Sequence, residues 1–140
     1  MTDIEKAERM GRARALIMAL AAAVLIFNVW LQYGDPQYAS AGGRGASWLV
    51  LIGLWLFILW NGGGLRPGGR VRALLNDELS LQNRSRALAL GFYAAILLTL
   101  ACYVGAWLTP IAAGDALKIV SAGAISAALL RYAWLEWRLH

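Results

Sequence analysis

The sequence contains very few of the residues that carry catalysis or hold metal ions. Its 140 residues include one histidine, His140 at the last position, and one cysteine, Cys102. One histidine and one cysteine give no basis for a catalytic triad, a disulfide or a cysteine-rich metal site. The glycine-rich stretch 62–69 lacks the Lys-Ser/Thr ending of a nucleotide-binding loop. We therefore expect a non-enzymatic protein without a cofactor or a bound metal.

Charged residues are also scarce, at 15% of the chain, while hydrophobic residues make up 60%. Soluble domains contain roughly 25% charged and roughly 45–50% apolar residues. A soluble domain of this length could not cover so much apolar surface. Disordered chains, by contrast, are poor in apolar residues. The composition excludes both classes and predicts a membrane protein.

The apolar residues fall into four stretches, each long enough for a transmembrane helix. A helix needs about 20 residues to cross a hydrocarbon core about 30 Å thick. The expected fold is all-α: a single domain, residues 1–140, that forms a polytopic four-helix bundle with spans at about 15–33, 46–65, 87–108 and 116–137.

The distribution of Lys and Arg predicts the orientation of these spans. Eleven basic residues flank one side of the predicted membrane and two flank the other, Arg44 and Lys118. By the positive-inside rule, both termini and the middle loop are cytoplasmic, in a multi-pass protein of the bacterial inner (plasma) membrane. The formal net charge of +5 then reflects topology and attraction to anionic lipid headgroups. We do not expect direct nucleic-acid binding.

The middle loop contains the densest polar cluster in the chain. After the glycine-rich break, segment 71–86 has helical periodicity, and neither Gly nor Pro separates it from the third span. We expect one helix from about 71 to 108 whose first turns extend into the cytoplasm. Two interpretations of this extension remain open: a solvated helix, or a docking surface for a protein. The second makes a set of polar and apolar residues candidate partner-binding residues: Leu74, Leu75, Asp77, Glu78, Arg84 and Arg86.

Aromatic residues mark the predicted membrane boundaries. Trp60, Tyr132, Trp134 and Trp137 fall where the inner interface is expected, and amphipathic rings prefer that position. Trp134 and Trp137 belong to an aromatic C-terminal tail, so they are further candidate anchors for a partner.

Other features leave alternatives open. Gly91 with Ala95, and Gly123 with Ala127, form small-xxx-small pairs that serve either packing within the bundle or a homodimer. Arg131, the deepest charge, either extends to the inner headgroups or pairs within the bundle. Cys102 is expected to pack as a small apolar residue.

A small channel or transporter is an alternative function. It would need a polar path lined by Asn28, Thr99, Ser121 and Ser126, and Asn28 could instead hydrogen-bond a neighbouring helix. An accessory subunit of a larger membrane complex is a third interpretation.

The stretch Asn76–Ala101, 26 of the 140 residues, resembles a group of small four-helix prokaryotic membrane proteins that are encoded beside helix-turn-helix regulators of the XRE type. In that group an Asp-Glu pair precedes the third span, and basic residues lie between the pair and the span. In this chain Asp77 and Glu78 match the acidic pair, and Arg84 and Arg86 match the basic residues. The resemblance implies a membrane protein that tethers or controls a cytoplasmic DNA-binding regulator.

Overall fold

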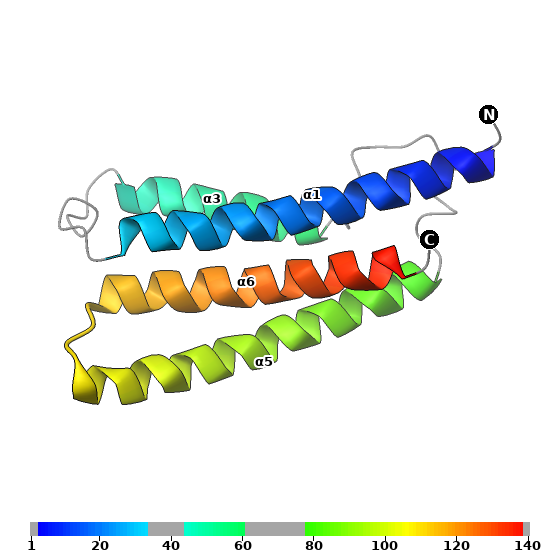
Figure 1. The fold of residues 1–140 in the computed structure, drawn as a ribbon. Helices are drawn as coiled ribbons and strands as arrows, with labels where there is room; N and C mark the ends of the chain where they lie inside the picture. Colours follow the sequence, from blue (N-terminus) through cyan, green and yellow to red (C-terminus); the bar gives the residue numbers. More distant parts are fainter. Residues whose placement is uncertain (1–2, 34–43, 61–77, 139–140) are drawn as a thin grey trace.

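The computed structural model describes residues 3–33, 44–60 and 78–138, and these form four α-helices. The helices are α1 (Asp3–Gln32), α3 (Arg44–Trp60), α5 (Glu78–Leu108) and α6 (Ala113–Trp137). Each runs in the opposite direction to the one before it, so α1 begins and α6 ends at the same end of the molecule (Figure 1). The predicted all-α fold is confirmed.

Three of the helices are long and apolar enough to cross a membrane. Their apolar stretches are Gly11–Gln32, Leu81–Leu108 and Ala113–Trp137. Helix α3 has 17 residues, which is about 26 Å at 1.5 Å per residue. The residues 61–65 expected to complete its span lie outside the described part of the chain. The three long helices indicate a membrane-embedded protein, and many large apolar side chains are exposed on them, as such a protein requires.

Two helices begin well before the spans predicted from the sequence. Helix α1 starts at Asp3, although the first span was predicted from about 15. Helix α5 runs without a break from Glu78 into the third span, as predicted, whereas residues 71–77 of the predicted extension lie outside the described ranges. Helix α5 ends at Leu108, just before Thr109-Pro110, because a proline disfavours helical geometry in the residue before it.

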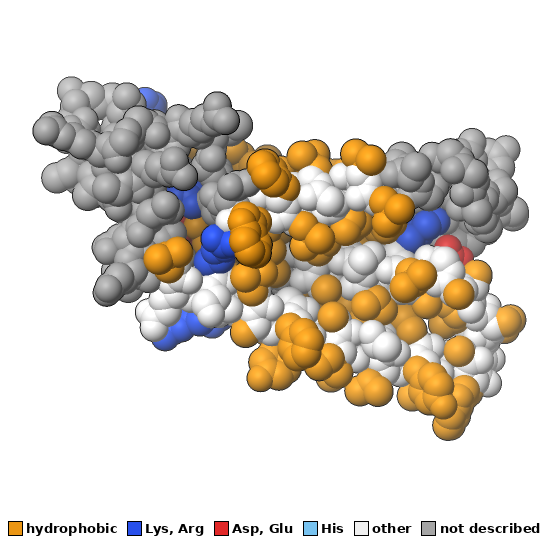
Figure 2. Space-filling model, turned by 180° about the vertical axis from the view of Figure 1, so that it is seen from behind, with side chains coloured by type: hydrophobic (Ala, Val, Ile, Leu, Met, Phe, Trp, Pro, Cys, Tyr) orange, Lys and Arg blue, Asp and Glu red, His pale blue; other side chains and the backbone are white. Residues whose placement is uncertain are grey.

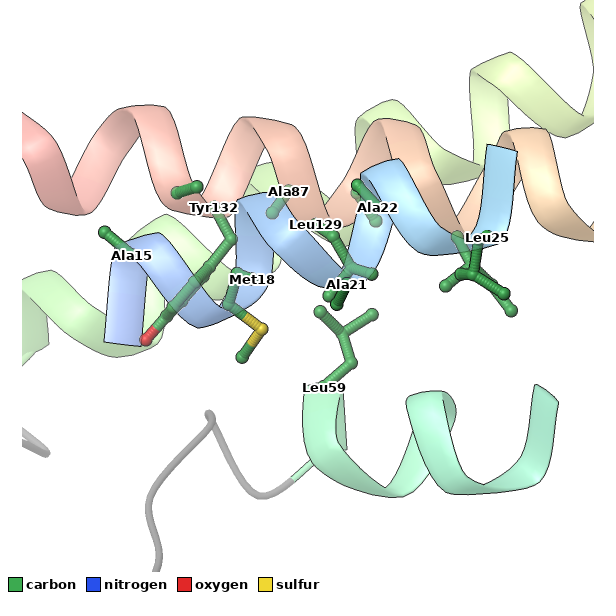
Figure 3. Packing of buried hydrophobic residues seen from close by; sticks show 12 residues of the cluster. Ala15, Met18, Ala21, Ala22, Leu25, Leu59, Ala87, Leu129 and Tyr132 are labelled. Carbon is green, nitrogen blue, oxygen red and sulfur yellow. The ribbon is translucent and has the colours of Figure 1, made fainter. Parts of the chain in front are cut away.

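Helix α6 is the central helix of the fold. It packs along both α5 and α1 and makes a smaller contact with α3, while the other described helices do not pack extensively on one another. The bundle is therefore organised around α6. Figure 3 shows Leu59 of α3 pointing toward Ala21 of α1 and Leu129 of α6, and Trp55 packs against the same cluster.

Glycines allow α5 and α6 to approach closely. A Cβ atom added at Gly91 would lie 3.0 Å from both the Ala124 carbonyl oxygen and the Ala128 Cβ, and one added at Gly123 would overlap Leu98. Close approach increases dispersion contacts, which matter because lipid removes the hydrophobic drive between helices. Gly91 and Gly123, for which the sequence left two uses open, thus serve packing within one chain.

Candidate functional site

Positively charged side chains gather at the end of the molecule where α1 begins and α6 ends. Figure 2 shows the blue side chains concentrated there, with an apolar surface beyond them. We call this the basic end; its described cations are Arg9, Arg12, Arg14, Arg84, Arg86, Arg131 and Arg138. At the opposite end, Lys118 lies 3.9 Å from Asp115 in an ion pair on α6.

A buried polar layer, consisting of Arg14, Asn83, Tyr132 and Glu136, lies beneath the basic end. All four residues are more than nine-tenths buried. An Arg14 Nη atom donates a hydrogen bond of 2.7 Å to the Tyr132 hydroxyl, and the guanidinium carbon lies 5.9 Å from the centre of the tyrosine ring. Glu136 follows Tyr132 by one turn on α6 and shares its face.

The helix register places Asn83 in the same layer. Asn83, Ala87 and Gly91 follow one another at steps of four along the buried face of α5. Gly91 packs between Ala124 and Ala128, so Asn83, about two turns earlier on the antiparallel helix, is level with Tyr132 and Glu136. Its Nδ2 group is buried and has no hydrogen-bond acceptor among the described residues.

This layer contains residues from α1, α5 and α6, with a hydrogen bond between α1 and α6, and it was not predicted from the sequence. The prediction that Tyr132 marks the membrane interface is wrong, because its ring points from α6 toward the α1 turn with Ala15 and Met18 (Figure 3). If one of several interacting buried polar side chains is removed, its partners are left unpaired in an apolar environment, which lowers the stability of the fold. The hydrogen bond between Arg14 and Tyr132 therefore stabilises the packing of α1 against α6 at the basic end.

The structure places the predicted partner-binding residues in three situations. Leu74, Leu75 and Asp77 lie outside the described ranges. Glu78 is the first residue of α5, and only its backbone is described. The described members all lie at the basic end, on the adjoining ends of α5 and α6: Arg84, Arg86, Trp134 and Trp137.

Three of these four are exposed. Arg86 is exposed to solvent or lipid, while Trp134 is 54% exposed and Trp137 is 64% exposed. The Arg138 guanidinium carbon lies 4.9 Å from the centre of a Trp134 ring, close enough for a cation–π contact. The end of α6 thus presents an aromatic and cationic surface.

The polar residues that a channel would use do not line one path. The Thr99 hydroxyl is on the exposed side of α5 and donates to its own helix, at the Ala95 carbonyl, over 2.8 Å. The Ser126 hydroxyl is buried between α6 and α1, where it donates to the Ala22 carbonyl over 3.4 Å. These two hydroxyls therefore lie on different surfaces.

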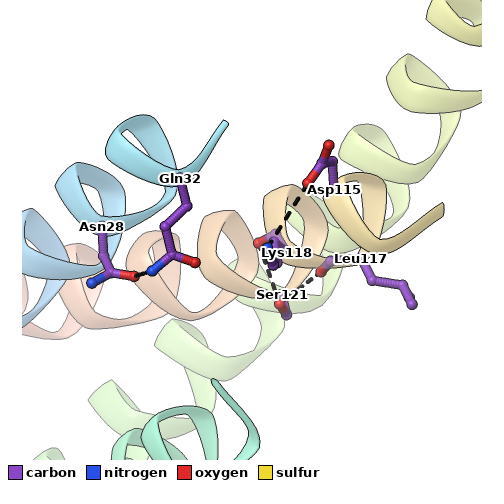
Figure 4. A network of polar contacts seen from close by, with 6 residues as sticks. All are labelled: Asn28, Gln32, Asp115, Leu117, Lys118 and Ser121. Carbon is purple, nitrogen blue, oxygen red and sulfur yellow. Dashed lines mark hydrogen bonds and ion pairs between the residues drawn. The ribbon is translucent and has the colours of Figure 1, made fainter. Parts of the chain in front are cut away.

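The other two polar residues that a channel would use, Asn28 and Ser121, lie near the end of the molecule opposite the basic end (Figure 4). The Gln32 side-chain amide donates to the Asn28 side-chain oxygen, so the bond described for this oxygen lies within α1. The Ser121 hydroxyl donates to the Leu117 carbonyl over 2.7 Å. The Asn28 oxygen and the Ser121 hydroxyl therefore each bond to a residue of their own helix, one turn away.

Two further residues whose role was open are also placed. Arg131 is on the exposed surface of α6, which excludes pairing in the bundle interior. Cys102 is a free, half-buried cysteine on α5. Within the described ranges, no three His, Cys, Asp or Glu side chains come together as a metal site would require.

Comparison with known proteins identifies no relative. No protein-family model matches the chain, and neither a curated protein nor a solved structure matches it significantly.

Proposed function

We propose that this is a non-enzymatic protein of the bacterial inner membrane that binds a cytoplasmic protein at its basic end. The partner we propose is a helix-turn-helix transcription regulator, held or controlled at the membrane. The resemblance of Asn76–Ala101 supports the identity of this partner, and the geometry of the basic end supports the mode of binding.

The proposed topology has four passes and cytoplasmic termini. Helix α1 begins and α6 ends at the same end of the molecule, which supports an even number of membrane crossings. If α1, α5 and α6 cross, α3 crosses too, and a short span is accommodated at modest cost by local thinning of the bilayer. The concentration of arginines at this end supports a cytoplasmic position for it.

The observation that carries the proposal is the continuity of α1 through its charged first turns. The helix has 30 residues, of which 22 belong to its apolar stretch, so 8 precede it, about 12 Å of helix. Figure 1 shows this part of α1 projecting past the end of α6. A charged arm that continues a packed helix is held in a fixed direction and loses little entropy when a partner binds it.

Exposed tryptophans at the end of α6 complete the proposed surface. Tryptophan and arginine are enriched among the residues that dominate binding energy at protein interfaces. Trp134 and Trp137 are both more than half exposed, and the buried polar layer holds the turn of α6 from which they project. The described charged side chains exposed around these tryptophans are arginines, whereas the sequence of the first turns of α1 also carries Asp3, Glu5 and Glu8, so the partner should present charges of both signs around an apolar pocket.

The proposal predicts that partner recovery depends on the exposed tryptophans of the basic end and on the acidic pair predicted from the sequence to bind the partner. We expect Trp134→Ala with Trp137→Ala, and separately Asp77→Ala with Glu78→Ala, to abolish recovery of a small DNA-binding protein with the tagged chain. Loss of an interface anchor costs about 2 kcal/mol or more, which is about a thirtyfold loss of affinity. The measurement is affinity purification from native membranes, followed by mass spectrometry of the proteins recovered.

Matched controls come from the opposite end. Trp107 is an exposed tryptophan on α5, and Asp115 is an acidic residue of α6; Trp107→Ala and Asp115→Ala should leave recovery unchanged. Equal loss in the controls, or unchanged recovery in the variants of the basic end, would contradict the proposal. Recovery of other membrane subunits alone would favour an accessory role, and recovery of no protein would favour a small transporter.

A further inference from the structure

Arg84 of α5 lies against the last residue of α3. Its guanidinium carbon is 5.3 Å from the centre of a Trp60 ring, within the range of a cation–π contact. Trp60 is 73% exposed, whereas Arg84 is half-buried. Helices α3 and α5 do not pack extensively along each other in the described part of the chain, so this contact joins two helices that otherwise touch little.

The guanidinium has no acidic partner in the described ranges. At the opposite end, by contrast, Lys118 forms an ion pair with Asp115. No hydrogen bond joins Arg84 to another described residue. A guanidinium placed over an aromatic ring keeps N–H groups at its edge, which can bind two oxygens of an anion at once.

Apolar side chains continue from Arg84 and Trp60 toward the middle of the membrane. Leu88 follows Arg84 by one turn on α5, and Phe57 precedes Trp60 by about one turn on α3, so each shares a face with its neighbour. Both are exposed. Arg84 itself lies near the start of the apolar stretch Leu81–Leu108, the depth at which headgroups meet hydrocarbon. The surface is therefore cationic at the boundary and apolar below it.

We propose that Arg84 and Trp60 form the headgroup end of a binding site for an anionic phospholipid. Arg84 binds the phosphate oxygens, the Trp60 ring holds the guanidinium in place, and an acyl chain lies along Leu88 and Phe57. A peptide carboxylate or a nucleic acid would match the cation but not the exposed apolar surface below it. The site requires only that the helices are embedded in a membrane, so it does not depend on the proposed protein partner.

The test measures binding of phosphatidylglycerol to the purified full-length protein in detergent by native mass spectrometry at high ionic strength. Salt screens the diffuse attraction of exposed charges but acts less on a partly buried contact. We expect saturable binding of one lipid and an affinity about tenfold lower in Arg84→Gln, because a hydrogen bond to a charged group is worth about 1.5 kcal/mol or more. Arg84→Lys, which keeps the charge but not the two-pronged geometry, should give an intermediate loss.

Arg86→Gln is the matched control. It removes the same charge from an exposed position two residues further along α5 and should leave the affinity within about twofold of the wild type, since exposed charges are largely screened at this salt. Equal effects of Arg84→Gln and Arg86→Gln would overturn the proposed site, because they would show diffuse attraction alone. Equal binding of phosphatidylcholine with the same acyl chains would also overturn it, as would displacement of the lipid by millimolar inorganic phosphate.

Discussion

Tyr132→Ala is expected to destabilise the folded protein by about 3–5 kcal/mol, the usual cost of truncating a buried aromatic residue. Tyr132 is the largest of the fully buried side chains and packs in the core cluster with α1 and α6 residues. Its hydroxyl also accepts a hydrogen bond from the buried Arg14. The substitution therefore leaves a cavity and removes an acceptor from a buried cation, and lipid cannot enter to replace either.

The measurement is reversible unfolding of the purified protein in mixed micelles by titration with dodecyl sulfate. Tyr132→Phe separates the two contributions: it keeps the ring, and a hydrogen bond in a membrane protein is worth on average only about 0.6 kcal/mol. Tyr93→Ala is the matched control, because Tyr93 is exposed on α5 and contacts its neighbour Phe92. Equal destabilisation by Tyr132→Ala and Tyr93→Ala would show that Tyr132 is not part of the core.

Gly91→Val is expected to destabilise the protein by about 1–3 kcal/mol, the typical cost of overpacking. The first added carbon already meets the Ala124 carbonyl oxygen and the Ala128 Cβ at 3.0 Å. One of these neighbours belongs to the backbone and the other is attached directly to it, so neither can move aside without a shift of α6. The two methyl groups of valine increase the overlap, and we expect α5 and α6 to separate locally.

Gly53→Val supplies the control for helix propensity in the same unfolding assay. A Cβ atom at Gly53 would have no neighbour within 4 Å, and valine has a higher intrinsic helix propensity than glycine. We expect this variant to be as stable as the wild type or slightly more stable. If Gly91→Val proved equally harmless, the close approach of α5 and α6 would be refuted.

The positions of the helices could largely be predicted because they depend on local composition. Long apolar runs predict helices wherever a membrane removes water, and this placed the cores of α1, α5 and α6. The start of α1 was missed because its first turns are polar, and hydropathy carries no signal for a polar helix that continues an apolar one. Hydropathy also gave no means of deciding which helix would be central.

The buried polar layer could not be predicted because it depends on the register between helices distant in sequence. Arg14 and Tyr132 are 118 residues apart, and each alone fits the pattern of a residue at a membrane boundary. The available signal was the spacing of four between Tyr132 and Glu136, which places both on one face of α6. The use of Gly91 and Gly123 was undecided for the same reason: small residues indicate close packing without indicating the partner helix.

The central claim is that the basic end faces the cytoplasm, and labelling of single cysteines tests it most directly. In a Cys102→Ser background, Gln82→Cys places a thiol on an exposed position of α5 at the basic end, and Gly114→Cys places one on an exposed position of α6 at the opposite end. A membrane-impermeant maleimide is added to spheroplasts before and after permeabilisation. We predict that Gly114→Cys reacts in both conditions and Gln82→Cys only after permeabilisation. Reaction of Gln82→Cys in sealed spheroplasts would contradict the account.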